Sequence, residues 1–195
     1  EGISFFLIDF KQPGVTIRPI RNIAGHEEFC EVFLDNVRVP ADCLVGKINQ
    51  GWTIAKALLG FERIFLGSPK QSQFALMRLE EMAESSGKID DPQFAEHLTL
   101  LKIDVLDLID SYQHFADIVR SGQPLGPEVS LLKIWATETF SKITEVMIET
   151  AGAEGAAIGG INFGDTQIDV MSQFYNARPA TIYGGSNEIQ RNILS

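Results

Sequence analysis

A seam of apolar residues, spaced alternately four and three apart, constrains the fold of this chain more than any other feature. Such spacing places side chains on one face of a helix that packs against other helices. Asp91 and Pro92 precede the seam as a typical N-cap and first helical residue, and Gly122 is a typical stop. The sequence therefore predicts one long helix between them. The seam consists of Phe94, Leu98, Leu101, Val105, Leu108, Tyr112, Phe115 and Val119.

Further helices are predicted on both sides of this one. A helical pattern runs from Trp52 to Ala83 with an interruption at Pro69, and another runs from about Pro127 to Ala151. A glycine-rich loop over 152–165, a shorter helix over about 167–178 and a last helix from near Gly185 complete the pattern. Long helices with such seams predict an antiparallel four-helix bundle. The seam of the helix ending at Ala151 consists of Val129, Leu132, Ala136, Thr139, Ile143, Val146 and Thr150.

Residues 1–46 instead have the composition and turn residues of β-strands. Strands are predicted over 3–10, 15–20 and 28–34, with a type II turn at Pro13-Gly14 and a tight reversal at Asp35-Asn36 into 37–39. So few short strands do not make a complete sheet domain. The predicted fold class is therefore mainly α: the last strands of a β domain over 1–46, followed by a helical bundle domain over 47–195.

Composition excludes several classes of protein. The net charge of −10 and the lack of a Lys/Arg run exclude a nucleic-acid partner. No apolar stretch approaches the roughly 20 residues that span a bilayer, so membrane insertion is not expected, and no signal peptide is visible. His26, His97 and His114 lack metal-ligand spacing, so no metal is expected. Two cysteines suit a reducing compartment, and a cytoplasmic location is preferred to the mitochondrial matrix. Both ends fall inside a pattern, so the chain is interpreted as a fragment.

Glu62 is the most informative single residue. Its helical neighbours one turn away in each direction are Leu58, Leu59, Phe65 and Leu66, all of which are apolar. A carboxylate that loses water in such surroundings becomes a better proton acceptor, which suits a general base. A buried glutamate bonded to a neighbouring helix, or one at the rim of the bundle, fits the same pattern.

Two glycine-containing segments have both a structural and a functional interpretation. Gly184 and Gly185 precede a helix whose free N–H groups could hold an anion such as a pyrophosphate, although such loop-to-helix junctions are common. Gly152 is first of all a helix stop.

Three ordered motifs resemble the acyl-CoA dehydrogenase family over nearly the whole chain. The segment 31–40 with Leu44-Val45-Gly46 is similar to the end of the family's middle β domain. The segment 49–52 leading to Glu62-Arg63 is similar to its first C-terminal helix. The segment 182–192, which reads Ile-Tyr-Gly-Gly-Ser-Asn-Glu-Ile-Gln-Arg-Asn, is similar to the motif that follows the family's catalytic loop.

The resemblance implies an FAD-dependent oxidation. In the family a carboxylate removes the α-proton of an acyl-CoA thioester while a hydride passes from the β-carbon to the flavin, which gives the trans-2-enoyl-CoA. An electron-transfer flavoprotein then accepts the electrons. Many members carry the base directly after the tyrosine of the last motif, where this chain has Gly184. A minority carry it on the first bundle helix before an arginine, where this chain has Glu62.

The resemblance therefore implies Glu62 as catalytic base and Arg63 as a substrate-binding residue. It implies FAD contacts for Ser186, Glu188 and Gly152. Two departures matter: no Arg-x-x-Phe-Gly stretch occurs between the first two helices, and Glu149 replaces the glutamine of the family's pyrophosphate loop. The assembly is either a homotetramer or an α2β2 heterotetramer with this chain as the base-bearing subunit. An acyl-CoA oxidase and a non-catalytic partner subunit are the alternatives, and the fragment alone is expected to be inactive.

Overall fold

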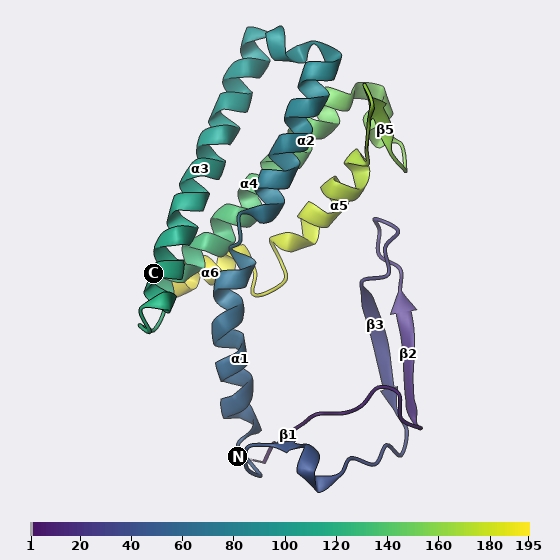
Figure 1. The fold of residues 1–195 in the computed structure, drawn as a ribbon, viewed down its shortest axis with the longest axis vertical. Coiled ribbons are helices and arrows are strands. Elements are labelled where there is room, and N and C mark those ends of the chain that lie inside the picture. The colour runs from purple at the N-terminus through teal and green to yellow at the C-terminus, as the bar shows by residue number, and fades with distance from the viewer. Residues whose placement is uncertain (1) are drawn as a thin grey trace. The chain divides into compact units, whose positions relative to one another are not determined.

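A computed structural model describes residues 2–195, with the side chains at positions 60, 61 and 63 left out of the description. Contacts divide the chain into two units, Glu1–Glu62 and Arg63–Ser195, so the division falls inside the first helix. Figure 1 shows the elements of both units. The chain is mainly helical, as predicted. Among the residues described, no helix combines the length and the apolar character needed to cross a bilayer.

The first unit contains four short strands and the beginning of α1 (Gly51–Leu66). Strand β1 (Phe5–Phe6) pairs with β4 (Leu44–Val45), and β2 (Val15–Ile20) pairs with β3 (Phe29–Leu34), both in antiparallel fashion. A single 3₁₀ turn at Ala41–Cys43 precedes β4. The predicted strands over 15–20 and 28–34 are thus confirmed, whereas only two residues of the predicted strand over 3–10 are paired.

The predicted reversal from β3 into a strand at 37–39 is wrong. The Asp35 N–H donates to the Gly14 carbonyl oxygen at 2.8 Å, which continues the pairing of β3 with the β2 side of the hairpin. Asn36 then adopts a φ of 50°, and the next residues leave the ladder unpaired. Gly14 has a φ of 89° and follows Pro13, as the predicted type II turn requires.

The second unit is an antiparallel bundle that continues from the end of α1. Figure 1 shows α2, α3, α4 and α5 alternating in direction, with α4 in contact with each of the others and with α6. Further 3₁₀ turns lie at Lys88–Asp90, Pro127–Val129 and Gly152–Ala156. The helices are α2 (Lys70–Ser86), α3 (Pro92–Arg120), α4 (Ser130–Ala151), α5 (Val170–Ala180) and α6 (Asn187–Leu194).

Both predicted seams form the core of this bundle. All seven seam residues of the segment 129–150 are buried, and the α3 seam is buried or half-buried throughout. The Asp91 side chain accepts a hydrogen bond from the Gln93 N–H at 2.9 Å, as an N-cap does. The connection Gly67–Pro69 separates α1 from α2, as the position of Pro69 predicted.

One element of the second unit was not predicted. The glycine-rich segment 152–165, which was expected to be a loop, contains β5 (Ile161–Phe163). Its hairpin partner β6 (Thr166–Ile168) follows that segment, so the helix predicted over about 167–178 begins only at Val170, as α5. Ile161 and Ile168 are paired and buried against the core, which anchors the hairpin. Gly164 adopts a φ of 57°, which suits a two-residue turn.

Candidate functional site

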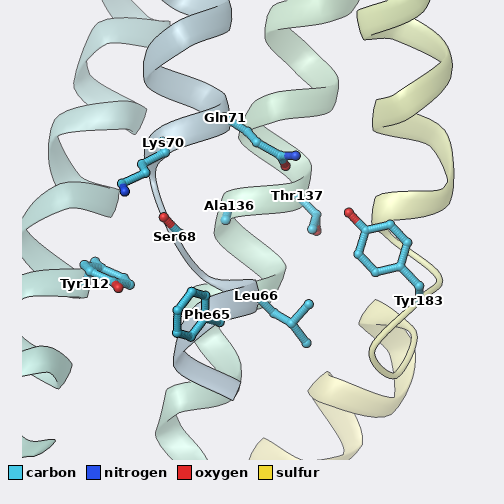
Figure 2. Close-up of a pocket in the computed structure, with 9 residues that line it drawn as sticks. All are labelled: Phe65, Leu66, Ser68, Lys70, Gln71, Tyr112, Ala136, Thr137 and Tyr183. Carbon is cyan, nitrogen blue, oxygen red and sulfur yellow. The ribbon is translucent and has the colours of Figure 1, made fainter. Parts of the chain in front are cut away.

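A cavity of about 500 Å³ opens in the second unit where five segments meet. They are the end of α1 with its connection to α2, the start of α2, the second half of α3, the first half of α4 and the turn before α6. Figure 2 shows the lining side chains, with the Tyr183 ring extending from the turn toward α4. The lining residues are Phe65, Leu66, Ser68, Lys70, Gln71, Tyr112, Ala136, Thr137 and Tyr183.

Gly67 brings the end of α1 close to α4. A Cβ atom at this position would lie 2.3 Å from Leu132 Cβ and 3.1 Å from the Leu132 carbonyl carbon. These two atoms are a Cβ atom and a backbone atom of Leu132, which is fully buried. They cannot move aside by a rotation of the side chain. Position 67 therefore needs a glycine. The close approach of this glycine to α4 positions the preceding residues Phe65 and Leu66, which line the cavity.

The turn before α6 is held by hydrogen bonds from the helix that follows it. Gly184 and Gly185 adopt φ values of 66° and 84°, which disfavour residues with a side chain. The buried Gln190 amide donates to the Gly184 carbonyl oxygen at 3.1 Å and lies 3.5 Å from that of Gly185. A Cβ at Gly184 would lie 2.5 Å from Leu66 Cδ1, so this turn also touches the end of α1.

The first turn of α6 brings Ser186 and Glu188 together. Ser186 is the N-cap, and its hydroxyl oxygen accepts from the Ile189 N–H at 3.4 Å. The pKa of Glu188 is lowered, first by a backbone N–H and then by a hydrogen bond with Ser186, with help from the charges of Arg191 and Lys133. Glu188 is exposed, and it therefore presents an ionised carboxylate beside a half-buried hydroxyl.

A buried lysine lies behind this turn, and the sequence analysis did not single it out. Lys133 on α4 is only 2% exposed, and its Nζ donates to Asn187 Oδ1 at 2.7 Å. Burial lowers the pKa of Lys133, opposed by the charges of Glu188 and Glu138. A signal was present in the sequence: the positions three, four and seven residues later, Ala136, Thr137 and Phe140, belong to the same helical face and lack charge.

The structure places Glu62 on α1 with an exposed side chain. The apolar face that was expected to exclude water from it is uncovered, because Leu58, Leu59 and Phe65 are each at least half exposed. The expected desolvation of Glu62 is therefore wrong for this chain by itself. The predicted substrate-binding side chain of Arg63 lies outside the described residues.

Gly152 is not brought near Ser186 and Glu188. It ends α4 with a φ of 62°, as the predicted helix stop, and it is exposed. The turn before α6 instead packs near Thr137, fifteen residues earlier on the same helix, a separation of roughly 22 Å along the helix axis.

Comparisons with known proteins place these features in one family. The model of the acyl-CoA dehydrogenase C-terminal domain matches residues 49–195. The whole chain aligns with acyl-CoA dehydrogenase IpdE1 of Mycobacterium tuberculosis at 36% identity and with IpdE1 of Mycolicibacterium smegmatis at 34%. The chain covers 49% and 48% of these proteins, so it spans about half the length of the curated relatives it matches.

Solved structures share the fold at lower sequence identity. A structure described as the Tcur3481-Tcur3483 steroid ACAD matches with a TM-score of 0.86 and 20% identity, over 98% of this chain and 50% of that one. Butyryl-CoA dehydrogenase from Megasphaera elsdenii matches with a TM-score of 0.80 and 20% identity, over 98% and 50%. By its sequence match over 49–195, and with a fold that agrees, this chain belongs to the acyl-CoA dehydrogenase family, of which it carries the C-terminal helical domain.

Proposed function

We propose that the enzyme containing this chain oxidises an acyl-CoA thioester to the trans-2-enoyl-CoA, with Glu62 as the base that removes the α-proton. One observation carries this proposal: of the two positions where family members carry the base, this chain has a glycine at one and a glutamate at the other. Gly184 follows Tyr183 and has no acidic group, whereas Glu62 precedes Arg63 on the first bundle helix.

The close approach of Leu66 supports a base on α1 rather than on the turn. The Leu66 side chain occupies the space into which a side chain at position 184 would project. The positive φ of Gly184 adds a second penalty for any residue with a Cβ atom. A carboxylate at 184 would therefore require Leu66 to move and the turn to change its conformation.

The first turn of α6 offers groups that fit part of FAD. The Ser186 hydroxyl both donates and accepts, and the ionised Glu188 carboxylate accepts. This set suits the hydroxyl-bearing parts of the cofactor, whereas a phosphate beside Glu188 would be repelled. FAD, when bound, would supply the acceptor for the hydride that leaves the β-carbon.

Glu62 would act on the proton next to the thioester carbonyl. A carbon acid of this kind is weak, so the base works best when water is excluded from it. The side chain is exposed beside an uncovered apolar face in this chain. The acyl group, the cofactor and protein outside this chain would therefore supply the cover, and Arg63 would bind and orient the thioester.

A Glu62→Gln variant of the intact enzyme tests the assignment. Glutamine keeps the shape of the side chain but cannot accept the proton, so the variant should bind FAD normally. Flavin bleaching by acyl-CoA should be slower by about 10²- to 10⁴-fold, the usual contribution of a general base. Stopped-flow absorbance of the bound flavin measures both properties in one sample.

Glu96→Gln is the matched control, because Glu96 is an exposed glutamate on α3 in the second unit. Its bleaching rate should equal that of the unmodified enzyme. Normal bleaching by the Glu62→Gln variant would show that the base lies elsewhere.

A heterotetramer with a second kind of subunit is the assembly that we favour within this proposal. The chain lacks the Arg-x-x-Phe-Gly stretch and carries Glu149 where the family has a glutamine. Two solved structures with this fold are described as pairs of proteins, Tcur3481-Tcur3483 and the ChsE4-ChsE5 complex of Mycobacterium tuberculosis. Co-purification of a second chain, with one FAD for each pair, would support this assembly, and one FAD for each copy in a homotetramer would exclude it.

Electron-transfer flavoprotein is the proposed electron acceptor, and the oxidase alternative differs only at this step. Turnover with acyl-CoA should reduce the electron-transfer flavoprotein and release no hydrogen peroxide. Stoichiometric peroxide release in air would identify an oxidase.

A further inference from the structure

We propose that Lys133 is a positioning residue that holds the turn from Tyr183 to Glu188 against α4 through the Asn187 side chain. The Lys133 ammonium is almost completely buried, and its Nζ donates a hydrogen bond to Asn187 Oδ1. A buried lysine is costly unless it is paired, so its presence beside a turn of the candidate site needs a physical reason.

The hydrogen bonds of Asn187 fix the orientation of its amide. Lys133 Nζ can only donate, so the amide oxygen must face it, at 2.7 Å. The amide nitrogen then faces Thr137 and Glu138, which are also on α4. It donates to Thr137 Oγ1 at 3.1 Å and to Glu138 Oε1 at 3.2 Å. Asn187 is 3% exposed, so water does not offer these groups an easy alternative.

The backbone of Asn187 passes this restraint to the turn. Its N–H donates to the Thr181 carbonyl oxygen at 2.9 Å, which closes the segment 181–187. Gln190, one turn later in α6, holds the carbonyl oxygen of Gly184. Hydrogen bonds from α6 therefore hold the turn at Thr181 and at Gly184. The Asn187 side chain in turn holds the first residues of α6 against α4.

The same contacts reach the wall of the cavity. Thr137 accepts from Asn187 and lines the cavity together with Tyr183. Ser186 and Glu188 flank Asn187 in the sequence, so loss of its restraint would displace both groups proposed to contact FAD. This last step rests on the proposed function, whereas the restraint of the turn does not.

Charged groups around Lys133 complete the arrangement. Glu138 on α4 accepts from Arg191 Nη2 of α6 at 2.6 Å, and Glu188 at the start of α6 also acts on the lysine charge. The Arg191–Glu138 pair is partly exposed and is worth little alone. Lys133 is the buried member of this set, and its substitution is therefore the sharpest test.

Hydrogen exchange of the intact protein with a Lys133→Met substitution tests the proposal. Methionine keeps most of the side-chain volume and removes the donor. Amides over 181–190 should exchange roughly ten- to a hundredfold faster, the usual effect of losing a hydrogen bond to a charged group. Amides over 98–108 in α3, which lie outside this network, should exchange at the unmodified rate.

Lys142→Met is the matched control, since it removes an exposed lysine of the same helix that pairs with Asp104. It should leave exchange over 181–190 unchanged. Asn187→Ala keeps Lys133 and removes its partner, so it should reproduce the selective increase even where Lys133→Met fails to fold. Unchanged exchange over 181–190, or an equal increase in both segments, would overturn the proposal.

The dissociation constant of FAD separates this inference from the proposed function. Selective loosening of 181–190 with weaker FAD binding supports both. Selective loosening with unchanged FAD binding supports the positioning role of Lys133 and excludes Ser186 and Glu188 as cofactor contacts.

Discussion

Leu66 Cδ1 lies 2.5 Å from the place where a Cβ atom at Gly184 would stand. The two residues are far apart in the sequence, one at the end of α1 and the other in the turn before α6. Leu66 lines the cavity, and its approach to the turn requires a residue without a side chain at position 184.

Gly184→Ala should destabilise the protein for two separable reasons. The added methyl group meets Leu66, and the φ of 66° disfavours any residue with a Cβ atom. Together these effects should lower the free energy of unfolding by about 1–3 kcal/mol, as measured by urea denaturation.

A double-mutant cycle with Leu66→Ala separates the two reasons. Shortening Leu66 removes the steric part, so Gly184→Ala should cost less in the Leu66→Ala background than in the unmodified protein. Equal costs in both backgrounds would show that Leu66 does not press on the turn.

Gly67→Ala should also destabilise the protein, by about 1–3 kcal/mol. The new methyl group would overlap Leu132 Cβ and approach the α4 backbone, neither of which can rotate away. Urea denaturation of the intact protein provides the measurement. A variant as stable as the unmodified protein would contradict the close approach of this connection to α4.

Lys133 should make the stability of the protein depend on alkaline pH. Burial lowers its pKa in the folded state, although Glu188 and Glu138 oppose the shift and Arg191 lies nearby. Between the lowered pKa and about 10.4, the unfolded chain then holds a proton that the folded chain has lost. The free energy of unfolding from this group therefore rises with pH in that window, by at most about 1.4 kcal/mol per pH unit, and is constant below it.

The Lys133→Met variant provides the reference for this measurement. The difference in unfolding free energy between the unmodified protein and the variant should grow in favour of the unmodified protein as pH rises. A difference that stays flat or falls over this window would mean that the folded state does not disfavour the charged lysine.

Asp91→Ala should cost about 1 kcal/mol of stability, because it removes the N-cap of α3 and leaves the Gln93 N–H without that acceptor. Asp90→Ala is the matched control, since Asp90 is the adjacent exposed acid and does not cap the helix. Thermal unfolding of both variants measures the difference. Equal midpoints for the two variants would assign no stabilising role to the cap.

The helical part of the fold was predictable because local and global signals agree there. The α3 seam, the Asp91 cap and Gly122 mark one helix, and the core needs the face that the seam provides. The hairpin of β5 and β6 was missed because each of its strands is only three residues long and β5 lies between two glycines. Its stability comes from burial of Ile161 and Ile168 against the core, which a local pattern does not reveal.

The candidate site was less predictable than the fold. Proximity of Ser186 and Glu188 followed from their places in one helical turn, whereas the separation of Gly152 from them depends on how α6 packs along α4. Lys133 was overlooked because a lysine is normally assigned to the surface, and only tertiary packing buries it. Glu62 showed the reverse error, since its apolar neighbours are real but are not covered by this chain.

The hairpin of β2 and β3 has a practical consequence. Every residue of β3 is exposed, including Phe29, Val32 and Phe33, and Ile17 and Ile20 of β2 are uncovered as well. Two strands with bare aromatic and branched side chains and open edges readily pair with other copies. Overproduction of residues 1–195 alone should therefore yield aggregates that form through this hairpin. Charged substitutions at Phe29 or Val32 should increase the yield of the protein in solution.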